Sequence, residues 1–87
     1  MLTKENLWQR IKEHEGEIFH TTGRYLPFTY KVLYDCIIVN DKMSLKIYRQ
    51  TLEELYKLKP KKHYEIKETL FTKSYIISIL NDPRITF

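Results

Sequence analysis

Two groups of residues in the chain have side chains of the types that catalyse reactions in enzymes. Cys36, the only cysteine, and His20 have the types of a nucleophile and its base. Cys36 begins the apolar run 36–39, where a buried and inert thiol is the ordinary outcome. We therefore interpret Cys36 as a core residue.

A second group resembles part of a metal-dependent nuclease site. Glu65, Ile66 and Lys67 form an acid, apolar residue, lysine tripeptide, and Asp41 would be the upstream acid that shares a metal with Glu65. Alternating charges on a solvated strand explain this tripeptide more simply in a chain with 30% charged residues. We expect no enzyme, and a nuclease would require Asp41 and Glu65 to converge on one metal position.

Metal and cofactor sites are not expected either. His14, His20 and His63 are scattered and lack the paired spacing of zinc ligands. The two glycines, Gly16 and Gly23, are too few for a Gly-rich loop around a phosphate chain. The sequence thus predicts no cofactor and excludes the nucleotide-binding loop folds.

The charge distribution carries the strongest functional signal. The net charge is +4, and residues 24–62 hold nine basic and four acidic residues, a net charge of +5, with tyrosines among them. Lysine and arginine bind phosphates, and aromatic rings stack on the bases of single strands. We expect a non-enzymatic DNA- or RNA-binding protein. The expected phosphate contacts are Arg24, Lys31, Lys42, Lys46, Arg49, Lys57, Lys59, Lys61 and Lys62, and the expected stacking surfaces are Tyr25, Tyr34 and Tyr48.

The alternative is a protein-interaction module, such as a small phage- or plasmid-encoded regulator or inhibitor that docks through a Tyr-rich face. One observation separates the two hypotheses. A continuous positive surface favours nucleic acid, whereas exposed Tyr and Leu within a mixed-charge rim favour protein. The twelve aromatic residues could also leave an apolar patch that pairs two copies in a homo-oligomer.

Hydrophobic periodicity indicates the elements that position these residues. Helical spacing predicts a helix over residues 4–15 with Leu7, Trp8 and Ile11 along one stripe. It also predicts a helix over 48–58, with a start as early as Leu45, and a short last helix capped by Ser74 and stopped at 81–83. Alternation predicts strands over 17–22, over 28–34 with Phe28, Tyr30 and Val32 facing the core, and over 36–40, which is central or covered by a helix. Residues 64–70 alternate weakly, which predicts a strand or an ordered loop.

These elements predict one α+β domain over residues 1–87. A small antiparallel sheet of three to four strands packs against the N-terminal, central and C-terminal helices. No apolar run is long enough for a membrane span, Met1 leads into a polar stretch without a signal peptide, and the lone cysteine indicates a reduced thiol. We expect a cytoplasmic protein with no membrane partner.

A pattern independent of charge spans residues 16–85. Its members are Gly16, Phe19, Thr21, Gly23, Phe28, Tyr30, Val32, Val39, Leu52, Pro60, Ser74, Tyr75, Ile76, Ile79, Leu80, Asp82, Pro83, Arg84 and Ile85. It resembles a group of small uncharacterised bacterial and mobile-element proteins and appended domains with Gly-x-x-Phe-x-Thr, Phe-x-Tyr-x-Val, Ser-Tyr-Ile and Asp-x-Arg-Ile motifs and no settled function. Thr72 and Lys73 stand where that group has Gly-Pro. The resemblance marks Tyr75 and Arg84, whose structural roles would be a buried hydroxyl and a tie between the C-terminal segment and the sheet.

Overall fold

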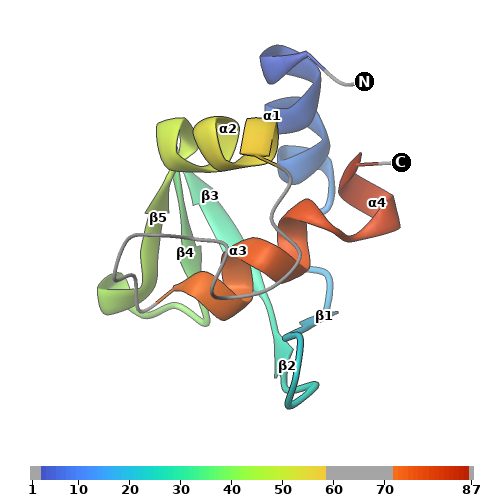
Figure 1. Ribbon diagram of the computed structural model, residues 1–87. Helices are drawn as coiled ribbons and strands as arrows, with labels where there is room; N and C mark the ends of the chain where they lie inside the picture. Colours follow the sequence, from blue (N-terminus) through green and yellow to red (C-terminus); the bar gives the residue numbers. More distant parts are fainter. Residues whose placement is uncertain (1–2, 59–71, 87) are drawn as a thin grey trace.

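The fold is α+β, as predicted, in a computed structural model that describes residues 3–58 and 72–86 (Figure 1). The elements in chain order are α1 (Lys4–Glu13), β1 (Phe19–His20), β2 (Pro27–Phe28), β3 (Tyr30–Leu33), β4 (Cys36–Val39), the 3₁₀ helix η1 (Met43–Leu45), β5 (Lys46–Tyr48), α2 (Arg49–Leu58), α3 (Lys73–Leu80) and α4 (Pro83–Thr86). The predicted segment 64–70 lies outside the described residues.

The main sheet is an antiparallel meander in the order β3-β4-β5. A two-residue loop at Tyr34 and Asp35 joins β3 to β4, with Leu33 opposite Cys36. After β4, Asn40 and Asp41 both hold positive φ, and the Lys42 amide donates to the Val39 carbonyl at 3.0 Å. This is the geometry of a type I′ turn, in which Asn and Asp are favoured. The predicted central position of β4 is confirmed.

Two sequence-based strand predictions were wrong in detail. The predicted strand 28–34 is interrupted at Thr29, so β1 and β2 form a separate two-stranded sheet instead of joining the meander. The third strand of the main sheet is β5, in a stretch predicted as loop and helix start. Ile47 is buried there while Tyr48 is exposed, a strand alternation too short for periodicity to detect.

The helices start and end close to their predicted bounds. In α1, the Thr3 hydroxyl accepts the Asn6 amide hydrogen at 3.1 Å, and the predicted stripe of Leu7, Trp8 and Ile11 is buried. Helix α2 begins at Arg49, not at Leu45 or Tyr48, because β5 precedes it. In α3 the cap is Thr72 rather than Ser74, since the Thr72 carbonyl accepts the Ile76 amide hydrogen.

The core lies between the inner face of the main sheet and the helices. The inner side chains of the sheet are Tyr30, Val32, Ile37, Val39 and Ile47, and they pack with Leu7, Trp8, Ile11, Leu52, Ile76, Ile77, Ile79, Leu80 and Ile85 from the helices and with Phe19 and Phe28 from the small sheet. None of the helices in the described part of the chain combines the length and the apolar character that crossing a bilayer requires.

Tyr30 joins β3 to α1 by two kinds of contact. Its buried hydroxyl donates to the Ile11 carbonyl at 2.6 Å, and its own carbonyl accepts the Gly16 amide hydrogen at 3.0 Å. Next to it, the Val32 amide donates to the Glu15 carboxylate at 2.7 Å. The end of α1 and the residues after it therefore hold the outer edge of β3.

Removing the Tyr30 hydroxyl should destabilise the fold. Tyr30→Phe leaves the Ile11 carbonyl without its partner in a buried place, so we expect the free energy of unfolding to fall by about 1–3 kcal/mol in urea titrations. Tyr34→Phe is the matched control, because Tyr34 is 90% exposed, and it should change stability by less than about 0.5 kcal/mol. Equal stability of the two variants would contradict this role for Tyr30.

Candidate functional site

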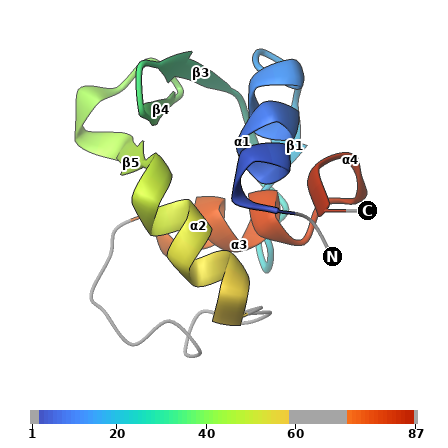
Figure 2. The same ribbon diagram turned by 90° about the horizontal axis from the view of Figure 1, so that it is seen from above.

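The described helices lie on one side of the three-stranded sheet, as Figure 2 shows from above. The register places Lys31 beside Ile38 and Lys46, and Leu33 beside Cys36 and Tyr48. Because successive side chains of a strand point to opposite faces, these residues share the face that points away from the helices. We call this surface the outer face, and its members are Lys31, Leu33, Cys36, Ile38, Lys46 and Tyr48.

The outer face has a shielded centre and an exposed aromatic and aliphatic margin. Cys36 and Ile38 are only 5% and 9% exposed, although no described helix covers them. Their neighbours on this face are Leu33, Tyr48, Lys31 and Lys46, and long basic side chains of this kind can cover apolar surface with their methylenes. At the margin, Leu33 is 42%, Tyr48 58% and Tyr34 90% exposed.

Two hollows share Asp35 and Tyr48 among their lining residues. The first, of about 240 Å³, is lined by Leu33, Tyr34, Asp35, Cys36, Lys46 and Tyr48. The second, of about 360 Å³, is lined by Asp35, Tyr48, Arg49, Gln50 and Glu53. The Cys36 thiol in the first hollow donates to the Leu33 carbonyl at 3.0 Å, and Cys36 is buried as predicted.

Ion pairs make the rim of the outer face mixed in charge. Lys31 lies 3.1 Å from the Asp41 carboxylate, and Arg49 contacts Glu53 at 2.9 Å and Asp35 at 3.9 Å. Lys46 lies over the Tyr48 ring, 5.3 Å from its centroid. Within the described residues, neither Lys42 nor Lys46 has a carboxylate partner, so the uncompensated charge near this face is positive.

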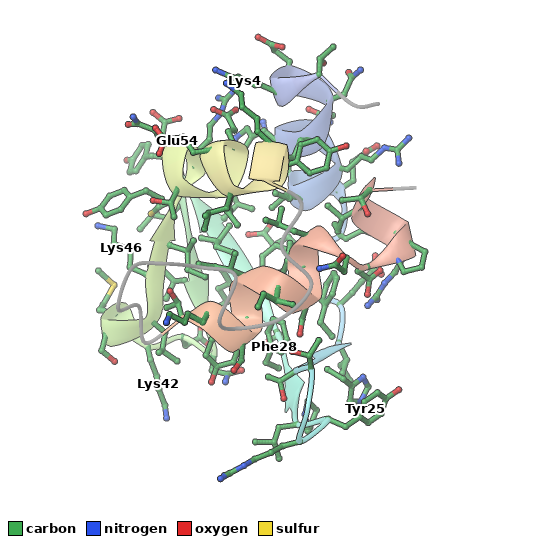
Figure 3. The ribbon with its side chains drawn as sticks, in the orientation of Figure 1. Lys4, Tyr25, Phe28, Lys42, Lys46 and Glu54 are labelled. Carbon is green, nitrogen blue, oxygen red and sulfur yellow. The ribbon has the colours of Figure 1, made fainter. Side chains whose placement is uncertain are left out.

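The structure brings together only some of the residues predicted to contact nucleic acid. Lys31, Lys46 and Tyr48 share the outer face, and Tyr34 stands at its end. Figure 3 shows Lys42 and Lys46 on the side formed by η1 and β5, and Tyr25 at the end of the β1–β2 hairpin.

Two further predicted residues, Arg24 and Lys57, lie elsewhere, and Arg49 stands at the rim of the outer face. Arg24 follows Thr22 and Gly23 in the β1–β2 turn and lines a separate hollow of about 320 Å³ against α3. Lys57 is in the last turn of α2, and Arg49 stacks over the Trp8 ring at 5.4 Å. Lys59, Lys61 and Lys62 lie outside the described residues. The described members therefore form no single continuous basic surface.

The described residues of the two enzyme-like groups make contacts outside those groups. His20 stacks on Tyr25 with ring centroids 4.3 Å apart, and Asp41 is paired with Lys31. Glu65 and Lys67 lie outside the described residues. Among residues 3–58 and 72–86, no three His, Cys, Asp or Glu side chains gather in a way that could hold a metal ion.

Arg84 ties the C-terminal segment to the start of β1. Its guanidinium donates to the Asp82 carboxylate at 2.9 and 3.0 Å, to Glu17 at 3.2 Å and to the Ile18 carbonyl at 3.1 Å, and it lies 3.9 Å from the Phe19 ring centroid. Tyr75 is half-buried and packs edge-on against Phe28 at 4.9 Å. Both residues marked by the sequence pattern therefore make packing contacts.

Sequence reasoning missed the outer face as a unit because it missed β5. The trace of β5 in the sequence is the spacing of Lys46 and Tyr48 around the apolar Ile47, and three residues are too few to establish a period. The ion pairs of Lys31 and Arg49 depend on strand register and left no signal in the sequence. Comparison of the chain with protein-family models, with curated proteins and with solved structures finds no match.

The Arg84 contacts predict a dependence of stability on pH. Burial alone would raise the pKa of Asp82, but the hydrogen bonds from Arg84 outweigh it and hold that pKa below its ordinary value. When the pKa of a carboxyl is lower in the folded than in the unfolded state, the ionised carboxylate stabilises the fold. This stabilisation is complete at pH values above the unfolded-state pKa and is lost as the pH falls through the folded-state pKa.

We expect Asp82→Asn to lower the free energy of unfolding by about 1 kcal/mol at pH 7, because it removes the charge that Arg84 binds. The difference from the unsubstituted protein should shrink as the pH falls below about 4, where the native carboxyl is also protonated. Asp41→Asn removes an exposed pair and serves as control in the same urea titrations. A difference that stays constant between pH 7 and pH 2 would contradict this assignment.

Proposed function

We propose that this chain is a non-enzymatic protein-interaction module that docks an acidic partner protein through the outer face and Tyr34. The observation that carries the proposal is the exposure of Leu33, Tyr34 and Tyr48 within a rim of mixed charge. Aromatic anchors beside shielded pockets supply most of the energy in protein interfaces. A small regulator or inhibitor working in the cytoplasm fits this chemistry and the lone thiol.

Charge supports an acidic partner rather than a neutral one. Asp35 forms an ion pair with Arg49, and Asp41 forms one with Lys31. Neither Lys42 nor Lys46 forms an ion pair with a carboxylate of the described residues. A partner that carries carboxylates could place them beside these two ammonium groups. It would cover Asp35 and Asp41 only together with the basic side chains that neutralise them. Electrostatic complementarity of this kind sets specificity and association rate more than affinity.

The size of the surface supports a transient complex. Three strands of three to four residues present roughly 200 Å² of flat sheet at a spacing of about 4.8 Å and a rise of about 3.3 Å per residue. Stable interfaces bury about 800 Å² on each partner. The same limit argues against a stable homodimer formed through the outer face alone.

Single-stranded nucleic acid is the second candidate for this surface. Lys46 lies beside the exposed ring of Tyr48 on an open sheet, an arrangement that suits base stacking with a phosphate contact. A nucleic-acid strand carries a negative charge at every phosphate, and the pairing of Lys31 with Asp41 and of Arg49 with Asp35 leaves few basic side chains of this surface to meet such a row of charges. This shortage favours a protein partner, which needs carboxylates only near Lys42 and Lys46.

Capture from a native host lysate, before and after nuclease treatment, tests the proposal. We expect host proteins to be retained on the unsubstituted chain in a nuclease-resistant manner and to be lost by at least about tenfold from Leu33→Ser/Tyr48→Ser, because the aromatic and aliphatic anchors are removed. Tyr25→Ser is the control, since Tyr25 is more exposed than either Leu33 or Tyr48 but lies on the other hairpin, and it should retain the same proteins.

Two results would overturn the proposal. One is equal recovery of the same proteins by the double variant and the unsubstituted chain. The other is fluorescence polarisation at low salt in which the chain binds single-stranded oligonucleotides, the double variant does not, and nuclease removes the captured proteins. That pair of findings would assign the outer face to nucleic acid.

A further inference from the structure

The two edges of the main sheet differ in what occupies their backbone groups. On the β3 edge, the Tyr30 carbonyl accepts the Gly16 amide hydrogen and the Val32 amide donates to Glu15. Folded proteins protect sheet edges in such ways because free edge groups pair with other chains. The β3 edge is thus closed to a further strand.

The β5 edge has no such protection within the described residues. The Arg49 amide donates to the Asp35 carbonyl at 2.7 Å, and Ile47 lies opposite Ile37. In an antiparallel ladder, hydrogen-bonded pairs alternate with pairs whose backbone groups point outward. The N–H groups of Lys46 and Tyr48 therefore point away from β4, and no described residue accepts a hydrogen bond from either.

The side chains along this free edge determine what kind of strand fits. Lys46 and Tyr48 both belong to the outer face, one beside Ile38 and the other beside Cys36. Alternate residues of an added strand would lie next to them on the same face. A carboxylate would meet the Lys46 ammonium, and an apolar side chain two residues away would lie beside Tyr48 and the hollow that contains Cys36.

We propose that β5 accepts an extended, acidic segment of the partner protein as a fourth strand. The inference rests on the proposed function and adds the form and chemistry of the partner. Backbone hydrogen bonds to Lys46 and Tyr48 position the segment, and its acidic and apolar side chains select it. In peptide recognition by strand addition, backbone hydrogen bonds supply affinity and side-chain contacts supply specificity.

A synthetic peptide of alternating residues tests the inference. The probe carries glutamate, phenylalanine and glutamate on one face of the strand and threonine on the other, and the control peptide carries lysine in place of glutamate. Amide hydrogen exchange measured by NMR on the full chain should slow by at least about tenfold at Lys46 and Tyr48 with the acidic peptide. Exchange at Tyr30 and Val32, on the closed edge, should not change.

A charge reversal tests the side-chain part of the inference. Lys46→Glu should weaken binding of the acidic peptide by about fivefold and strengthen binding of the lysine peptide, because an attraction becomes a repulsion. Lys12→Glu is the matched control: Lys12 is also exposed but lies on α1, away from the sheet, and its reversal should leave the preference unchanged.

The outcomes separate this inference from the function on which it rests. Peptide-induced shifts at Leu33 and Cys36 without slower exchange at Lys46 and Tyr48 overturn strand addition and leave docking on the outer face intact. No binding of either peptide at millimolar concentration also overturns it, while partner capture decides the function independently. Slower exchange at the same amides on concentrating the chain without peptide would assign the edge to a second copy and overturn the inference.

Discussion

The position of Tyr30 determines which face of the sheet points toward the helices and which points away from them. Its ring packs against Phe19 with centroids 5.4 Å apart, and its hydroxyl is bonded to the Ile11 carbonyl. Burial raises the pKa of the phenol well above its ordinary value, so it remains a neutral donor at all physiological pH values. Because side chains alternate along a strand, fixing Tyr30 inward fixes Lys31 and Leu33 outward. The register then carries the same assignment across β4 and β5.

The size of the chain explains why one face stays open. The core is built around Phe19, which contacts Phe28 and Tyr30 through its ring and is covered by the Arg84 guanidinium. The three long described helices are needed to enclose that core from one side, and short chains bury a smaller share of their surface than long ones. No described α-helix forms a second layer over the outer face, where Leu33, Lys46 and Tyr48 lie beside Cys36 and Ile38.

The sequence predicted the structure correctly where a residue pattern is compatible with only one local arrangement. The stripe in α1, the inward Tyr30 and Val32, and the buried Cys36 followed from spacing and apolar context. The sequence did not predict the features that depend on how strands and charged side chains pair in space. A three-residue strand such as β5 gives no measurable period, and the partners of Lys31 and Arg49 depend on turns and register. The basic segment therefore looked more continuous in sequence than its described part is in space, and the open face, which needs β5, could not be assembled from the sequence.

The turn at Tyr34 holds an exposed aromatic side chain in an unfavourable backbone conformation. Positive φ disfavours bulky residues, and elsewhere the chain places Gly23, Asn40 and Asp41 in that region, as local energetics prefer. Tyr25 also has positive φ, but its ring is stacked on His20. Tyr34 has a φ of 53° and is 90% exposed, and no described aromatic ring stacks on it. Its conformational cost is not offset by any contact within the described fold. A glycine would adopt this φ without strain, and the exposed phenol ring lies at the end of the outer face, which is why we include Tyr34 in the surface that we propose for docking.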